Sequence, residues 1–210
     1  MTDVAPAPGR IGRPPDTDPA DTRRRIVDAA RHEFARRGYV AATNRAIAAL
    51  SGVTTGAVYH HYNSKAELYR AVHADAHDRV YERFADSARG HTSFIEMFDA
   101  VLDVAVEINE NDPSLAAFIG AARVDRRRHR ELAAVIVDDR IRRGAFSDGL
   151  IELGIATGEV AEPCRAQVVA FVDVVFVGLN DAVSDDLVRQ RTAIASIKSA
   201  MRGLLTMGAG

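Results

Sequence analysis

The first helical pattern in the chain begins at residue 19. From there the stretch ADTRRRIVDAARHEFARRG places apolar residues on one face at three- and four-residue spacing: Ile26, Ala29, Ala30 and Phe34. Its arginines fall mostly on the other faces: Arg23, Arg24, Arg31 and Arg37. Asp18 before Pro19 is typical of a helix start, and Gly38 is typical of a helix end. The pattern predicts an amphipathic helix over residues 19–37.

Two short helices and one long helix are predicted next. Thr43 fits the cap of a helix over 44–50 that buries Ile47 and Leu50, and Gly52 suits the turn after it.

The second short helix, over 55–62, has Thr54 as its cap and directs Val58 and Tyr62 at the core. Ser64 and Glu67 then form a capping-box pattern. This pattern opens a long helix that continues to about residue 88.

The rest of the chain also shows helical spacing. Breaks fall at 90–91, 112–113, 126–129, 158 and 162–163, and no run alternates as a strand does. The apolar run VVAFVDVVFV at 168–177 has β-branched residues, but its length and cap favour a buried helix. We predict an all-α protein of about nine helices.

The amino-acid composition narrows the class of protein and its compartment. The 210 residues are 47% hydrophobic and 27% charged, which is typical of a globular protein. A single cysteine excludes an intramolecular disulfide and fits a reducing compartment. No segment resembles a secretory signal or reaches the roughly 18 apolar residues of a membrane span. We therefore expect a soluble, cytoplasmic protein without a membrane partner.

Charge is unevenly distributed along the chain. Residues 1–64 contain nine Arg, no Lys and six acidic residues, whereas the remainder holds 18 basic and 23 acidic residues. Residues 35–66 contain no Asp or Glu at all. Such a segment in an acidic protein indicates a polyanionic partner, although chance alone can also produce it.

The stretch TNRAIAALSGVTTGAVYHHY has the pattern of a helix-turn-helix unit. In such a unit the second helix enters the major groove of DNA, and small residues at its tip allow close approach. Thr55 offers a donor and a methyl group to bases, and Arg45 suits a guanine edge. Lys65 lies at a helix start that suits a phosphate. The predicted DNA contacts are Arg45, Thr55, Gly56, Ala57, Tyr59, His60, His61 and Lys65.

Residues 23–72 resemble the N-terminal domain of TetR/AcrR-type transcriptional regulators. Three motifs carry the resemblance: I-x-x-A-A-x-x-x-F-x-x-x-G-Y, T-x-x-x-I-A-x-x-x-G-V and Y-x-H-Y-x-S-K-x-x-L. It implies a homodimer that binds a palindromic operator on double-stranded DNA and responds to a small-molecule effector, here an unknown and largely apolar one. It also implies a DNA-binding domain over 19–64 and an effector-binding and dimerisation domain over 65–210. Residues 1–18 are rich in Pro, Gly, Ala and Asp without periodicity, which predicts a flexible arm. Gly56 and Ala57 lack the polar groups that some relatives direct at bases.

The arm and a basic cluster add two weaker signals. GRIGRPP in the arm resembles a minor-groove binding core, so Arg13 is a candidate minor-groove contact, with a solvated tail as the alternative. The cluster RVDRRRHR over 123–130 is suited to DNA or an anionic effector. A solvated loop balanced by Asp125 and Glu131 is the alternative that we favour.

Other functions have less support. His73 and His77 have the i,i+4 spacing of metal ligands, but such a pair on a charged helix is usually solvated surface. Cys164 has no nearby base, so we interpret it as a packing residue rather than a redox sensor. No nucleophile elbow, phosphate loop or carboxylate pair is evident. We therefore predict no catalytic residues, no metal and no cofactor, and we keep a metal or redox sensor, or a ligand-binding protein without specific DNA recognition, as alternatives.

The C-terminal half supplies candidates for dimerisation and effector binding. Helices that are apolar nearly all round need burial on several sides, which suits a four-helix interface between protomers. The predicted interface residues are Val168, Val172, Phe176, Leu179, Ile194, Ile197, Met201 and Leu204, with packing inside one protomer alone as the alternative. An apolar cavity between helices is implied by the family resemblance. Its candidate lining is Phe94, Phe98, Leu102, Phe118, Phe146, Phe171, Val175 and Asn180. For any single Phe of this set, plain core packing is the alternative that we favour.

Overall fold

A computed structural model describes residues 18–182 and 186–207, without the side chains of 133–143, 180, 181 and 207. These residues form nine α-helices and two short 3-10 helices, and no strand occurs among them. The all-α prediction is confirmed. No helix in the described ranges is long and apolar enough to cross a membrane. Arg13 lies outside the described residues.

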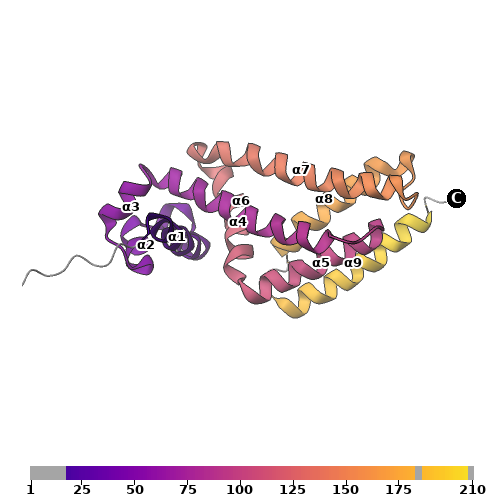
Figure 1. Cartoon of the computed structure of the whole chain (residues 1–210), viewed down its shortest axis with the longest axis horizontal. Helices are drawn as coiled ribbons and strands as arrows, with labels where there is room; N and C mark the ends of the chain where they lie inside the picture. Colours follow the sequence, from indigo (N-terminus) through magenta and orange to yellow (C-terminus); the bar gives the residue numbers. More distant parts are fainter. Residues whose placement is uncertain (1–17, 183–185, 208–210) are drawn as a thin grey trace, which may run out of the picture.

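The first three helices form a compact group at one end of the molecule (Figure 1). They are α1 (Pro19–Ala41), α2 (Asn44–Ser51) and α3 (Thr55–His61). The predicted caps are confirmed, because the side chains of Asp18, Thr43 and Thr54 each accept a hydrogen bond from a backbone N–H of the helix that follows. Gly52 has the left-handed backbone (φ 68°) that the turn between α2 and α3 requires.

Two details of this group differ from the prediction. Gly38 interrupts the helical backbone (φ 71°), but α1 resumes beyond it and ends at Ala41. Leu50 is 61% exposed rather than buried, because Ile47 and Ala48 alone supply the apolar core contacts of α2.

A long helix, α4 (Lys65–Ala88), leaves this group and enters the remaining bundle. The bundle consists of α5 (Phe94–Asn111), α6 (Pro113–Arg128), α7 (Ala133–Ala156), α8 (Arg165–Ala182) and α9 (Leu187–Met207). Two 3-10 turns connect its helices: η1 (Arg130–Leu132) and η2 (Glu162–Cys164). One core cluster joins α1–α4 to α5 and α6, and a second lies among α5, α7, α8 and α9.

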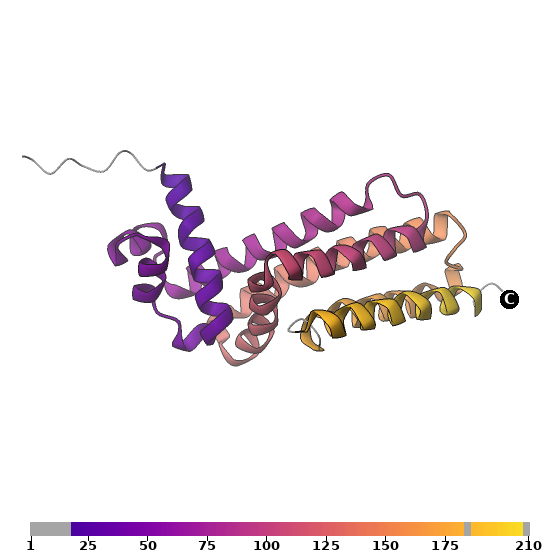
Figure 2. The same ribbon diagram turned by 90° about the horizontal axis from the view of Figure 1, so that it is seen from below.

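Helix α6 lies beside α1 and is attached to it at both ends (Figure 2). At its start, Nε of the buried Arg31 donates to Ser114 Oγ at 3.0 Å, and the Arg31 guanidinium lies 2.9 Å from the Asp112 carboxylate. Near its end, Asp125 Oδ2 accepts from the backbone N–H of Tyr39 at 2.8 Å and from the Tyr69 hydroxyl at 3.2 Å. The sequence placed Arg31 outside the apolar face and Asp125 in a solvated loop, and both predictions were wrong.

Candidate DNA-binding surface and effector pocket

Helix α3 is held by one face and exposes the other. Val58 is fully buried, and the Tyr62 ring is 2% exposed with its hydroxyl accepting from Arg23 Nε at 3.2 Å. The α3 residues predicted to contact DNA lie on its opposite face. Thr55, Gly56, Tyr59 and His60 are exposed there, and Ala57 and His61 are partly exposed. The core contacts thus fix the orientation of a helix whose tip consists of small residues.

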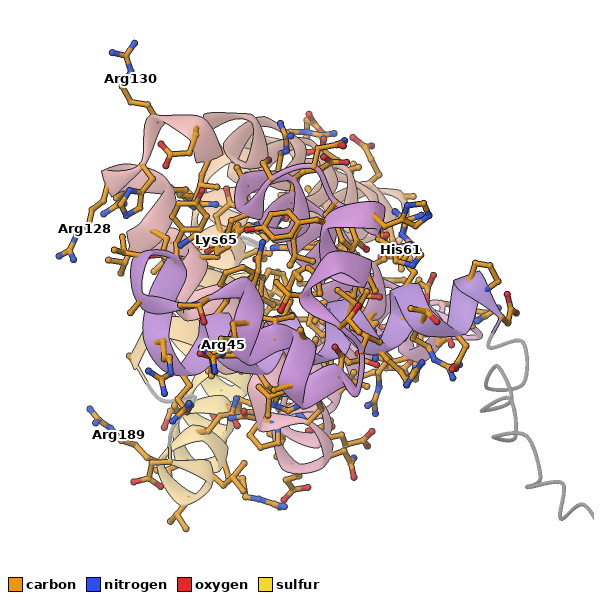
Figure 3. All side chains as sticks on the ribbon, turned by 90° about the vertical axis from the view of Figure 1, so that its left-hand side faces the viewer. Arg45, His61, Lys65, Arg128, Arg130 and Arg189 are labelled. Atoms are coloured by element: carbon orange, nitrogen blue, oxygen red, sulfur yellow. The ribbon has the colours of Figure 1, made fainter. Side chains whose placement is uncertain are left out.

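The surface around α3 is poor in negative charge. Arg45 is exposed at the start of α2, and Figure 3 shows it on the same end of the molecule as His61 and Lys65. The first carboxylate after residue 34, that of Glu67, is already engaged, because its Oε2 accepts from the Asn63 backbone N–H at 3.0 Å. This arrangement favours a polyanionic partner.

Lys65 has a structural role that the sequence did not indicate. Its Nζ donates to the carbonyl oxygens of Val40 and Ala42, both at 3.1 Å, and lies 4.7 Å from the centre of the Tyr39 ring. These contacts tie the start of α4 to the end of α1. An ammonium group has three donors, so one remains for a DNA phosphate. Lys65 therefore has a structural role beside α3, and its contact with DNA stays a prediction.

Replacing Lys65 with alanine is expected to lower the free energy of unfolding by about 1–3 kcal/mol, because two carbonyl acceptors lose a charged donor. Urea denaturation of the full chain measures this. Arg70→Ala is the matched control, since it removes an exposed positive charge from the same helix, and it should leave stability within about 0.5 kcal/mol of wild type. A Lys65→Ala variant as stable as the control would contradict the structural role.

A cavity of about 140 Å³ lies among α4, α5, α6, α8 and α9. Most of its wall is apolar and comes from all five helices. The apolar lining residues in the described part of the chain are Val80, Phe84, Ala105, Ile108, Ala116, Ile119, Phe176, Val177 and Leu179. The polar lining residues are His73, His77, Tyr81, Arg123, Arg126 and Gln190. A mostly apolar wall with a few polar groups is typical of a small-molecule site.

The histidine pair of α4 belongs to this cavity. His73 and His77 are 4% and 6% exposed, and their rings stack with centroids 4.2 Å apart. The Tyr81 ring continues the row, 5.9 Å from His77. The prediction that this pair is solvated surface was wrong, because α5, α6 and α8 cover this face of α4. No group of three His, Cys, Asp or Glu suited to a metal occurs among the described residues.

The pocket residues predicted from sequence are mostly elsewhere. Phe94, Phe98 and Leu102 are fully buried in the second core cluster, where Phe171 and Val175 also pack. Two rings lie next to the cavity without being among its lining residues. Phe118 is 6.4 Å from the His73 ring, and Phe146 is 5.9 Å from the Tyr81 ring. The side chain of Asn180 lies outside the described residues.

The predicted dimer residues are also largely internal. Val168, Val172, Ile194 and Met201 are buried within the protomer, and Ile197 and Leu204 pack against the same core. Phe176 and Leu179 line the cavity instead. Helical spacing identified the buried faces of α8 and α9 correctly, but the burial is against helices of the same chain. Most of this set is therefore already buried within one protomer, and its role between protomers stays a prediction.

Together, these features define a helix-turn-helix protein with an apolar cavity in a second helical bundle. Residues 26–72 match the family described as bacterial regulatory proteins, tetR family. The chain is 23% identical to the HTH-type transcriptional regulator UidR of Escherichia coli K12 over 90% of this chain and 96% of that protein. The chain belongs to the TetR family of DNA-binding transcriptional regulators.

Solved structures agree with this fold. Salmonella enterica GusR has a TM-score of 0.74 at 21% identity, over 91% of this chain and 98% of that one. FadR from Bacillus subtilis in complex with stearoyl-CoA has a TM-score of 0.66 at 20% identity, over 88% and 98%. As a member of this family the chain is a regulator rather than an enzyme, and the metal- or redox-sensing alternative is not favoured.

Proposed function

We propose that this chain acts in the cytoplasm as a homodimeric repressor, which binds a palindromic operator and leaves it when a small molecule occupies the cavity. One observation carries the DNA-binding part of the proposal. The exposed face of α3, with Thr55 and Gly56 at its tip, lies in a 32-residue stretch (35–66) without a carboxylate. Thr55 and Arg45 are the proposed determinants of operator sequence, because both can hydrogen-bond to base edges.

The outer faces of α8 and α9 are the proposed contact between protomers. Val174 of α8 is 70% exposed and Val188 of α9 is 77% exposed, whereas the opposite faces of both helices are buried. Small residues such as Ala170, Ala195 and Ser199 lie on the exposed side, which permits close helix packing. A two-fold dimer would present two α3 helices to successive major grooves, about 34–36 Å apart.

The cavity favours a compact effector with one ring. An apolar cavity of about 150 Å³ in another protein holds benzene, and the cavity here is about 140 Å³. That volume is far below what stearoyl-CoA, the ligand in the FadR structure, requires. Arg123 and Arg126 are among the lining residues, and guanidinium N–H donors suit a polar or anionic substituent.

Two helices connect this cavity to the DNA-binding helices. Helix α4 carries His73, His77 and Tyr81 at the cavity and Lys65 at the end of α1. Helix α6 lines the cavity and is fastened to α1 through Asp125. An effector can prefer a conformation in which the spacing of α4 and α6 differs from that of the DNA-binding conformation. Because it then binds that conformation more tightly, it shifts the population away from the DNA-binding one.

Binding of the full-length protein to DNA from its own upstream region tests the proposal directly. Fluorescence anisotropy should give saturable binding at low salt, and Arg45→Ala should weaken binding to this DNA more than to a scrambled duplex. Binding without sequence preference would favour the alternative of a ligand-binding protein that has lost specific recognition. Absence of binding would contradict the proposal.

Filling the cavity is expected to abolish the effector response and to leave DNA binding intact. Ala105→Phe places a ring in the cavity, whereas Ala85→Phe adds the same ring on the exposed side of α4. A thermal-shift screen of one-ring aromatic acids and phenols should find ligands that stabilise wild type and the Ala85→Phe variant but not Ala105→Phe. Equal ligand shifts in all three proteins would place the effector site elsewhere.

A further inference from the structure

A basic corner lies where α6 meets η1, outside the helix-turn-helix unit. We define it by Arg127, Arg128 and Arg130, all of which are exposed. None of the three has a side-chain hydrogen bond or ion pair in the part of the chain that the structure describes. The acidic residues on either side do not neutralise the corner: Asp125 is buried against Tyr39 and Tyr69, and Glu131 is a single exposed charge.

The corner is attached to the DNA-binding helices. The His129 ring, between Arg128 and Arg130, lies 5.2 Å from the ring of Tyr39, and the Lys65 ammonium lies 4.7 Å from the centre of that same Tyr39 ring. Figure 3 faces the end of the molecule that carries α3. It shows Arg128 and Arg130 projecting outward at one margin, on the same side as Lys65 and Arg45. The corner therefore adjoins Lys65 and the end of α1 through Tyr39.

Neighbouring arginines of the DNA-binding helices differ from those of the corner. Arg36 and Arg37, near the end of α1, both lie within 3.3 Å of the buried carboxylate of Glu33. Their charge is thus partly balanced inside the protein. The three corner arginines have long side chains and no such partner, and DNA carries one phosphate charge per about 1.7 Å of its axis. Backbone phosphates are the partner that this geometry and charge fit best.

We propose that the basic corner binds backbone phosphates beside the groove that α3 enters, so that the effector-binding bundle itself contacts the operator. This inference rests on the proposed DNA-binding function. It has a consequence for regulation, because Arg123 and Arg126 of the same helix line the cavity. A displacement of α6 by the effector then moves phosphate contacts directly, in addition to any change in the orientation of α3.

The test compares two double variants of the full-length protein on the same operator duplex. Arg128→Gln/Arg130→Gln removes two charges from the corner. The control variant Arg83→Gln/Arg89→Gln removes two positive charges from α4 and the turn after it. There Arg83 pairs with the exposed Glu107 and Arg89 with the exposed Asp86. The affinity of each double variant is measured against salt concentration. The corner variant should bind both operator and scrambled DNA at least about tenfold more weakly than wild type. The slope of log binding constant against log salt concentration should fall in magnitude by about 0.9 per lost contact, for up to about four contacts per dimer.

The control variant should keep the wild-type salt slope. The rescue variant Arg128→Lys/Arg130→Lys, which keeps both charges, should have a slope close to that of wild type. Thermal unfolding of the corner variant should match wild type, because these side chains are exposed and unpaired. A corner variant with the slope of the control would overturn the inference and leave the proposed function standing. Failure of the wild-type protein to bind the operator would instead count against the proposed function itself.

Discussion

Replacing Arg31 with alanine is expected to lower the free energy of unfolding by about 3–5 kcal/mol, the cost of breaking a buried ion pair from one side. The Arg31 side chain is 4% exposed and lies 2.9 Å from Asp112, 3.6 Å from Asp28 and 3.8 Å from Asp75. Its loss leaves the Asp112 carboxylate, at the start of α6, without this cation, whereas Asp28 and Asp75 keep Arg79. Urea denaturation at one fixed protein concentration measures the effect, because dimer stability depends on concentration.

Arg79 provides a matched control for this prediction. It pairs with two of the same carboxylates, at 2.9 Å from Asp28 and 2.8 Å from Asp75, but its side chain is 37% exposed. An exposed pair of this kind contributes about 0–1 kcal/mol. Arg79→Ala should therefore have a small effect. Similar losses in the two variants would show that burial of Arg31 between α1 and α6 does not hold these helices together.

Replacing Asp125 with alanine is expected to cost about 2–4 kcal/mol, because the Tyr39 N–H and the Tyr69 hydroxyl each lose a buried acceptor. Burial, and then the neighbouring Asp125 carboxylate, hold the pKa of Tyr69 well above its ordinary range. Its hydroxyl thus stays a neutral donor that needs a partner. Denaturation by urea again gives the measurement.

Asparagine at position 125 is the control, since its amide oxygen can accept both hydrogen bonds. Asp125→Asn should lose less than about 1 kcal/mol, within the usual contribution of one hydrogen bond. The difference between the two variants therefore reports the acceptor rather than the charge. An asparagine variant as unstable as the alanine variant would show that charge, and not hydrogen bonding, attaches the end of α6 to α1.

Features that depend on a few adjacent residues could be predicted from the sequence. The caps at Thr43, Thr54 and Ser64 and the turn at Gly52 each result from one side chain or one backbone angle, and all four occur in the structure. The core positions Val58 and Tyr62 followed from their four-residue spacing in the same way. Once Val58 and Tyr62 are assigned to the buried face, the other positions of α3 are predicted to be exposed.

Features that depend on which helices meet could not be predicted in this way. Periodicity indicates that Val172 and Met201 are buried, but it does not say whether the partner is the same chain or a second copy. His73 and His77 have polar neighbours in the sequence, and only the packing of α5, α6 and α8 over them makes them part of a cavity. The sequence predicted Lys65 only as a phosphate contact, because its acceptors at the end of α1 lie 23 and 25 residues away in the chain.

Selection of bound DNA from a random pool by the full-length protein tests the central claim most directly. Two α3 helices related by two-fold symmetry should enrich a palindrome with half-sites centred about 10–10.5 base pairs apart, or a multiple of that spacing. Repeating the selection with Thr55→Ala should change the preferred bases within each half-site while keeping the spacing. Enrichment of a single asymmetric site, or of no sequence at all, would contradict a symmetric regulator that recognises DNA through α3.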